Sequence, residues 1–304
     1  MPFQGVHAVL PTPFHSDGSL DLDSLKRMTN LYRRAGVNGI ATLGVTSEVN
    51  RLTETERAQV IESVVEEVSG QVPIIVGGTG EGLRICIERS RIAKSLGASA
   101  VLISPPRMAA LNSDAVLAHY SELARTVDIE IIVQDYPPAC GFTMEPTVLA
   151  RIAREIPSAR TIKLEDPPTP LKTAQILKAA QGLEIRILGG LGGVYLLEEL
   201  LAGASGAMTG FAYPEMLVEV VRLFSSGAID QAANAFYRYV PLMRFEFQQG
   251  IGTALRKEIL RRRGALAEAT VRAPGGALDA ATCRGLDILL QWMRDQQEVK
   301  WISA

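Results

Sequence analysis

One short apolar run of the sequence carries a lysine where a buried charge would be costly. In ARTIKLEDPP, Lys163 stands between Ile162 and Leu164, and alternation along a strand puts it on the opposite face from these two. Burial disfavours the ammonium form and lowers the pKa, and a neutral amine can attack a ketone to form a Schiff base. The alternative is a structural ion pair between Lys163 and Glu48 or Glu165.

Two hydroxyl groups gather in a second stretch, GVTSE at residues 44–48. Thr46 and Ser47, together with the backbone N–H groups of a tight turn, are able to clamp a small carboxylate. The alternative is an ordinary turn that leads into the next helix. On this interpretation the stretch has a structural role only.

A third stretch, IIVQDYPPACG, ends a predicted strand. Gln134 and Tyr136 lie two residues apart in it, so their side chains face the same way in an extended strand. The Tyr136 hydroxyl is a candidate proton carrier for a reaction at Lys163. Packing of the Tyr136 ring on the neighbouring prolines is the alternative.

Short β-branched runs recur along the chain with room for one crossover helix between each pair. The predicted strands are Val6–Leu10, Gly39–Leu43, Pro73–Gly77, Ala100–Ser104, Glu130–Gln134, Thr161–Leu164, Ile185–Gly189 and Gly206–Thr209. Eight strands that alternate with helices predict an α/β fold, a (β/α)8 TIM barrel over residues 1–222 with reactive groups at the carboxyl ends of the strands. An open doubly wound sheet is the alternative, but no GxGxxG motif follows the first strand.

Helix signals lie between several of these strands. Predicted helices include Leu22–Ala35, Asp114–Thr126 and Pro146–Glu155, and Thr53 with Glu56 forms a capping box before another. After Pro214 the strand signals end, and residues 223–304 are predicted to form a C-terminal helical extension. Its basic run RKEILRRRG is interpreted as a solvated helix face or a subunit contact, because no aromatic residue is interleaved in it.

The composition argues against several classes of function. The 304 residues carry a formal net charge of -2 with both signs interspersed, so no nucleic acid and no membrane surface is expected as a partner. No apolar run has transmembrane length, and the first residues lack a signal-peptide pattern. Three widely spaced cysteines predict reduced thiols in the cytoplasm. With three histidines and no HExxH or CxxC motif, neither a metal nor another cofactor is expected.

Taken together, these stretches resemble the dihydrodipicolinate synthase / N-acetylneuraminate lyase family of class I Schiff-base aldolases. The resemblance covers essentially the whole chain and includes GVHAVLPTPFHSDGSLDLDSLKRM, GVTSE, PIIVGGTGE, IKLED, AGASGAMTG and the helical tail. It implies that Lys163 forms an imine with the carbonyl of pyruvate or another 2-keto acid. It also implies that Thr46, with backbone groups near Gly190 and Met208, holds the carboxylate of that keto acid.

The departures from the family pattern concern the second substrate. Val45 stands where the synthases have a second threonine, and Arg107 stands in place of a tyrosine lent by a neighbouring subunit. The family's catalytic tyrosine falls on Gln134, and the arginine that clamps aspartate semialdehyde falls on Ala139. Loss of that charged hydrogen bond is worth about 1.5–3 kcal/mol, which argues against synthase activity.

Three functions are consistent with these observations. Ser47, Glu48 and the runs VQD and GAMTG are similar to the 2-keto-3-deoxy-sugar-acid dehydratase branch. They favour an imine-forming lyase, a dehydratase or a retro-aldolase, with Tyr136 or Ser47 as proton carrier. One alternative is 4-hydroxy-tetrahydrodipicolinate synthase, which condenses pyruvate with aspartate semialdehyde, and another is a catalytically silent barrel that binds a keto acid. The family further implies a homotetramer, a dimer of dimers, with Arg107 near a neighbour's site.

Overall fold

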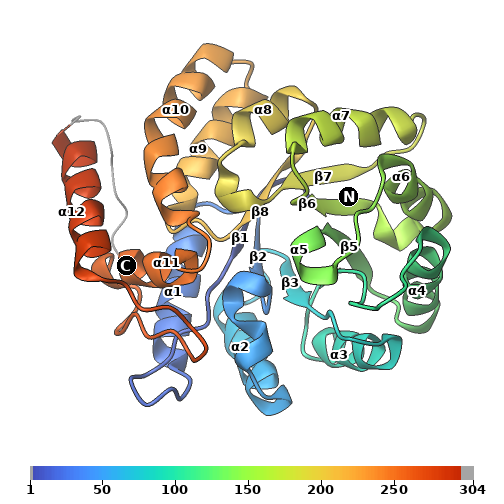
Figure 1. Cartoon of the computed structure of the whole chain (residues 1–304), viewed down its shortest axis with the longest axis horizontal. Coiled ribbons are helices and arrows are strands. Elements are labelled where there is room, and N and C mark those ends of the chain that lie inside the picture. The colour runs from blue at the N-terminus through green and yellow to red at the C-terminus, as the bar shows by residue number, and fades with distance from the viewer. Residues whose placement is uncertain (1–2, 296–304) are drawn as a thin grey trace.

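The strands of the chain close into a complete ring. The computed structural model describes residues 3–295, and its eight parallel strands pair in sequence order, with β8 returning to β1 (Figure 1). The strands are β1 (Gly5–Val9), β2 (Gly39–Thr42), β3 (Ile74–Gly77), β4 (Ala100–Ile103), β5 (Glu130–Asp135), β6 (Thr161–Leu164), β7 (Arg186–Gly189) and β8 (Gly206–Thr209). The predicted (β/α)8 barrel is confirmed, and every predicted strand end lies within one residue of the observed one.

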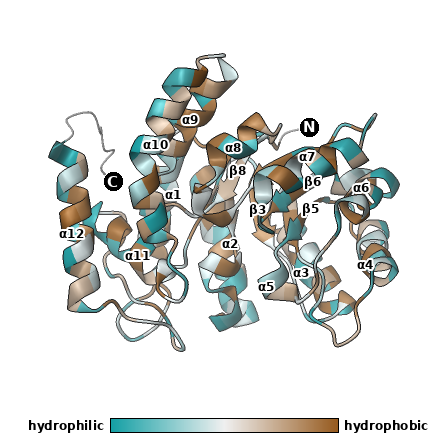
Figure 2. Ribbon diagram, turned by 45° about the horizontal axis from the view of Figure 1, so that its top comes forward, coloured by the Kyte–Doolittle hydropathy of each residue, from teal (hydrophilic) through white to brown (hydrophobic). Residues whose placement is uncertain are grey.

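Helices cover the outside of the barrel. The described α-helices, including the short loop helix α5 and the C-terminal helices, are α1 (Leu22–Arg34), α2 (Glu54–Val68), α3 (Leu83–Ser95), α4 (Ser113–Thr126), α5 (Pro137–Cys140), α6 (Pro146–Glu155), α7 (Thr169–Ala179), α8 (Leu196–Leu201), α9 (Pro214–Ser225), α10 (Ile229–Glu246), α11 (Gly252–Arg262) and α12 (Ala280–Asp295). The predicted capping box is confirmed at the start of α2, where Thr53 and Glu56 each accept the other's backbone N–H. Polar and apolar residues share these helices, as amphipathic packing requires (Figure 2). Among the described helices, none is long and apolar enough to cross a membrane.

Alternation divides the strand side chains between two apolar layers. Ile162 and Leu164 belong to the large cluster between the strands and the surrounding helices. Leu188 and Met208 belong to a smaller cluster inside the barrel. Because Lys163 stands between Ile162 and Leu164 in β6, its side chain points into the barrel, as the sequence pattern predicted.

The C-terminal helices lie on one side of the barrel (Figure 1). The predicted domain boundary at residue 222 falls inside α9, which packs against α10. The division into residues 1–222 and 223–304 therefore stays a prediction, and residues 296–304 lie outside the described part of the chain.

The basic run of α11 corrects one expectation. A solvated face is wrong for Arg256 and Lys257, because both side chains are buried. Arg256 Nε lies 2.7 Å from Glu246 Oε1, and Lys257 forms an ion pair with Glu48. Buried cations are tolerated here because carboxylates neutralise them. The sequence pattern could not show this, since the two carboxylates come from other elements of the fold.

Candidate active site

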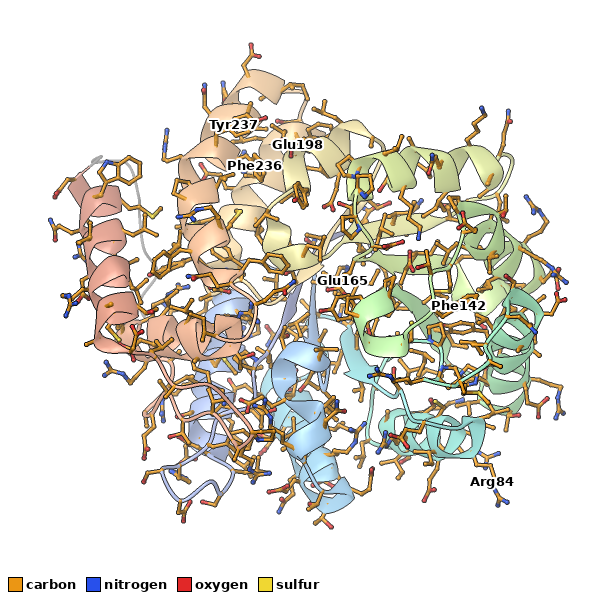
Figure 3. The ribbon with its side chains drawn as sticks, viewed as in Figure 1. Arg84, Phe142, Glu165, Glu198, Phe236 and Tyr237 are labelled. Carbon is orange, nitrogen blue, oxygen red and sulfur yellow. The ribbon has the colours of Figure 1, made fainter. Side chains whose placement is uncertain are left out.

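The Lys163 side chain is buried and contacts a carboxylate. The residue is 5% exposed, and its Nζ lies 3.1 Å from Glu165 Oε2. Of the two carboxylates expected as ion-pair partners, Glu165 therefore contacts Lys163, whereas Glu48 contacts Lys257. Figure 3 shows Glu165 near the centre of the ring of strands. The amine and the carboxylate thus meet at the mouth of the barrel.

Hydrogen bonds hold this carboxylate in place. Gln134 Nε2 donates to Glu165 Oε2 over 2.7 Å, and Gln134 Oε1 accepts from the Ser104 hydroxyl over 3.0 Å. Gln134 also pairs in register with Lys163 across β5 and β6. Sequence reasoning treated Glu165 only as an ion-pair partner. The alternation that turns Lys163 inward also places Glu165 on the same face, so the sequence pattern could have indicated Glu165 as a site residue.

A glycine makes room for Glu165. A Cβ added to Gly190 would lie 2.2 Å from the Cγ atom of Glu165, closer than any side chain could tolerate. Gly190 therefore borders the carboxylate directly, just beyond the end of β7. Met208, another residue expected near the keto acid, lies deeper in the inner apolar cluster.

Tyr136 follows β5 and stands at the N-terminus of the short helix α5. Its side chain is half-buried. Burial, and to a smaller extent the Glu165 carboxylate, raises the pKa of Tyr136. The phenol therefore keeps its proton at neutral pH and lies close enough to Glu165 to sense its charge.

A buried lysine ties together the loops after β5 and β6. Lys172 Nζ lies 2.7 Å from Asp135 Oδ2 and 2.7 Å from Asp166 Oδ2. Asp135 precedes Tyr136, and Asp166 follows Glu165. Burial raises the pKa of Asp135 to about 6, although the Lys172 ammonium opposes this shift. One α7 side chain thus fixes the backbone beside both residues.

The turn after β2 holds its hydroxyl groups in two different ways. Ser47 Oγ is fully buried, donates its hydrogen to the carbonyl of Leu10 and accepts the N–H of Gly44. Its hydroxyl hydrogen is therefore used within the turn. Thr46 is only partly buried, and Val45 is 49% exposed beside it. Of the two hydroxyl groups in the predicted clamp, that of Ser47 is therefore buried within the turn, whereas Thr46 is partly exposed.

A cavity of about 620 Å³ opens beside the Gln134 network. Three predicted substrate-binding residues line it, namely Val45, Gln134 and Arg107, and so does Ala139. Lys163 does not itself line the cavity, but its Nζ contacts the same Glu165 oxygen as the lining residue Gln134. The structure thereby brings residues at or beyond the ends of β2, β4 and β5 to one opening.

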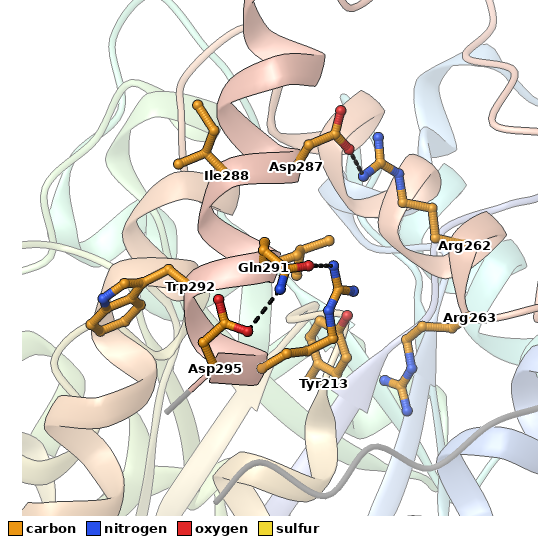
Figure 4. A pocket seen from close by; sticks show the side chains of 10 residues that line it. Tyr213, Arg262, Arg263, Asp287, Ile288, Gln291, Trp292 and Asp295 are labelled. Atoms are coloured by element: carbon orange, nitrogen blue, oxygen red, sulfur yellow. Dashed lines mark hydrogen bonds and ion pairs between the residues drawn. The ribbon is translucent and has the colours of Figure 1, made fainter. Parts of the chain in front are cut away.

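A larger cavity of about 880 Å³ lies against α11 and α12. There Arg262 bonds Asp287, and Gln291 bonds Asp295 (Figure 4). Among the described residues that line this cavity there is no lysine and none of the predicted site residues. This larger cavity therefore lies apart from the predicted site residues.

Fold and site together define a class of protein. A lysine inside a closed barrel, with a carboxylate in reach to take its proton, is equipped to form an imine with a carbonyl compound. That is the arrangement of a lyase that works through a lysine Schiff base. The family follows from comparison with known proteins: the model of the Dihydrodipicolinate synthetase family matches residues 2–291, and the chain belongs to this family.

Two relatives of the chain are named as different enzymes, a dehydratase and a synthase. The chain is 32% identical over 301 residues to L-2-keto-3-deoxyarabonate dehydratase of Azospirillum brasilense, covering 95% of this chain and 96% of the relative. It is 31% identical over 247 residues to 4-hydroxy-tetrahydrodipicolinate synthase of Methanothrix thermoacetophila, covering 81% and 82%. The crystal structure of dihydrodipicolinate synthase from Rhodopseudomonas palustris superposes with a TM-score of 0.90 at 32% identity, covering 95% and 97%. The chain is thus a lyase of this family.

Proposed function

We propose that this lyase is a dehydratase, which removes water from a 2-keto-3-deoxy acid through an imine on Lys163. The observation that carries the proposal is the convergence on Glu165 Oε2 of Lys163 Nζ, at 3.1 Å, and Gln134 Nε2, at 2.7 Å. The name of the Azospirillum brasilense relative, L-2-keto-3-deoxyarabonate dehydratase, supports the same class of reaction.

The first step joins the substrate to the enzyme. Glu165 accepts the proton that the Lys163 ammonium must lose, and the neutral amine then attacks the C2 ketone. Glu165 returns that proton to the C2 oxygen, and it then carries a second proton from the attached nitrogen to the same oxygen, which leaves as water. The product is an iminium, and Glu165 is ionised again for the next step.

The second step uses the iminium as an electron sink. Glu165 takes a proton from C3, and the electrons of the broken C–H bond form an enamine. The enamine then expels the C4 hydroxyl group, which leaves as water after Tyr136 has donated a proton to it. Ser47 is the less suitable donor, because the Leu10 carbonyl already takes its hydrogen. In this scheme Gln134 is the residue that orients Glu165.

The two ends of the substrate are assigned to different loops. Thr46, with backbone groups near Gly190 and Met208, holds the carboxylate. Val45 and Arg107 line the cavity, and they contact the part of the substrate beyond C4. The exposed guanidinium of Arg107 is suited to hydroxyl or carboxylate oxygens of that part.

Synthase activity is the second candidate, because several relatives are named 4-hydroxy-tetrahydrodipicolinate synthase. Ala139 lines the cavity where the family's semialdehyde-binding arginine is expected, so little turnover of aspartate semialdehyde is predicted.

One set of experiments separates the two candidates. Borohydride is added to the protein with pyruvate, and the mass of the Lys163 peptide is measured. A reduced adduct supports the imine on Lys163, whereas its absence would contradict it. Turnover is then measured on a panel of 2-keto-3-deoxy acids and on pyruvate with aspartate semialdehyde. Turnover of the semialdehyde alone would contradict the dehydratase proposal.

We further propose a cytoplasmic homotetramer. Ile85 and Met108 are large apolar side chains exposed near the cavity, 43% and 59%, which supports a subunit contact there. The free thiols of Cys86, Cys140 and Cys283 support a reducing compartment. A solved relative at 26% identity is described as a monomeric dihydrodipicolinate synthase variant, so the family is not uniform in this respect. Light scattering after gel filtration is the test, and a monomer would contradict the proposal.

A further inference from the structure

A buried arginine of the C-terminal extension reaches the barrel mouth. Arg256 stands on α11 and is 4% exposed. Its Nε donates to Glu246 Oε1 over 2.7 Å. The other oxygen of that carboxylate, Glu246 Oε2, accepts the backbone N–H of Ala212 over 2.9 Å. The guanidinium is thereby fixed to the segment that follows β8.

A second nitrogen of this guanidinium, Nη1, forms no hydrogen bond with Glu246. Arg256 Nη1 is buried and has no hydrogen-bond partner among the described residues. A Cβ added to Gly210 would lie 2.6 Å from Arg256 Nη1 and 3.2 Å from Thr46 Oγ1. Both polar atoms therefore border the same small space above Gly210. A buried N–H without a partner is expensive and uncommon, so its position calls for a reason.

The glycine explains how the guanidinium gains access. Gly210 lies two residues beyond Met208, whose side chain belongs to the inner cluster of the barrel. A Cβ at position 210 would clash with the Arg256 guanidinium, so its absence leaves room for a cation from outside the barrel. Because Glu246 binds the Nε side, the nitrogen without a partner is the one beside Thr46.

We propose that Arg256 is a positioning residue for recognition of the substrate carboxylate. On binding of the keto acid, Nη1–H donates to Thr46 Oγ1 and leaves the hydroxyl hydrogen of Thr46 to point at the carboxylate. The pair with Glu246 is neutral as a whole, but its positive Nη1 end is the part beside Thr46, and this orientation also favours an anion over a neutral group at this point. The inference rests on the proposed function, because that proposal assigns the carboxylate to Thr46.

The test compares two probes that differ in charge. Pyruvate and its neutral amide, pyruvamide, are titrated separately with borohydride, and the concentration that gives half-maximal adduct is measured for each. For Arg256→Gln, the value for pyruvate is expected to rise about tenfold, equivalent to about 1.4 kcal/mol, while that for pyruvamide changes less than about twofold. The maximal amount of adduct is expected to stay the same.

A second variant covers the possibility that Arg256→Gln does not fold. Gly210→Ala places a methyl group 2.6 Å from Nη1, which must then move, and is expected to reduce the preference for pyruvate in the same way. The matched control is Arg263→Gln, since Arg263 is another buried guanidinium from the end of α11, bonded to Glu215 and to the Ala212 carbonyl. This control is expected to lower the melting temperature and to leave the preference for pyruvate unchanged.

The outcomes distinguish the inference from the proposed function. If the wild-type protein forms no adduct with pyruvate, the imine proposal fails and the inference falls with it. If the wild-type protein forms the adduct and neither Arg256→Gln nor Gly210→Ala changes the preference, only the inference is overturned. An equal loss of preference in Arg263→Gln would also overturn the inference, because loss of any buried arginine near α11 would then have the same effect.

Discussion

Beside each of two glycines at the mouth of the barrel, a charged side chain fills the space that a Cβ atom would take, and the two side chains have opposite charge. The Glu165 carboxylate fills the space beside Gly190 after β7, and the Arg256 guanidinium fills the space beside Gly210 after β8. In both places a side chain on the glycine would displace the charged group. The barrel mouth thus carries a fixed anion beside Lys163 and a fixed cation beside Thr46.

The two regions differ in how their charges are held. Glu165 has Lys163 and Gln134 as partners, and both lie in the adjoining strands. Arg256 has Glu246 as its partner and comes from α11, outside the barrel. A group that must exchange protons needs a partner that can change its own protonation or hydrogen bonding, whereas a permanent cation needs only orientation. Under the proposed function, the chemistry therefore takes place on the Glu165 side and binding of the carboxylate on the Arg256 side.

The largest effect is expected from Lys163→Ala. Without the amine no imine forms, so the borohydride adduct should disappear and turnover should fall by at least about 10³-fold. The adduct is measured by mass spectrometry and the fold by circular dichroism. An adduct that survives in this variant would mean that another lysine is the nucleophile.

Glu165→Gln tests the chemical side of the comparison. The amide keeps the size of the side chain but is a poor proton acceptor, so kcat should fall about 10²–10⁴-fold, with a smaller change in KM. The carboxylate is also one of the groups that raise the pKa of Tyr136, so the alkaline limb of the pH profile should move to lower pH. A variant with unchanged kcat would leave the Lys163–Glu165 contact a structural ion pair.

Gly190→Ala sharpens the contrast with Gly210→Ala. The new methyl group would lie 2.2 Å from Glu165 Cγ and must displace the carboxylate. A misplacement of about 1 Å can cost about 10²-fold in rate, so kcat should fall by up to that factor. Gly210→Ala should instead raise KM for the keto acid. Steady-state kinetics of both variants with one substrate measure the difference, and equal effects on kcat and KM in both would remove the distinction.

The smallest effect concerns a carboxyl group near the site that is expected to take no part in the reaction. Glu199 lies on α8 and is buried, with the Thr169 hydroxyl at 2.5 Å. Burial raises the pKa of Glu199 to about 7 from an ordinary value of 4.5. The folded protein therefore binds this proton more tightly than the unfolded chain, and the associated stability is present below about pH 4.5 and is lost as the pH rises through 7.

Glu199→Gln removes this pH dependence. At pH 8 the free energy of unfolding should rise by about 1–3 kcal/mol, whereas kcat should stay within about twofold. Glu198→Gln is the control from the same helix, since Glu198 bonds the hydroxyl of Tyr237 near the surface (Figure 3). Urea denaturation at pH 5 and pH 8 measures both variants. A loss of kcat in Glu199→Gln as large as in Glu165→Gln would contradict the division between the two carboxyl groups.

Features of the site that depend on neighbouring residues in the sequence could be predicted, whereas contacts between distant elements could not. Alternation within β6 predicted the inward direction of Lys163, and it also placed Glu165 on the same face. The basic run of α11 was interpreted as a solvated face because its partners, such as Glu246 for Arg256, stand on other elements. Ser47 was predicted as a candidate proton carrier, but in the fold its hydroxyl group donates to the Leu10 carbonyl, which is distant in the sequence.

By itself, the sequence determined the order of strands and helices, the closed barrel they form and the inward direction of Lys163. Each of these follows from periodicities of a few residues, which are local and therefore readable along one chain. Only the tertiary structure decided which charges meet: Lys163 with Glu165 rather than Glu48, and Arg256 with Glu246 beside Thr46. The physical reason is that the energy of a buried charge depends on neighbours within a few ångströms, and those neighbours come from distant parts of the chain.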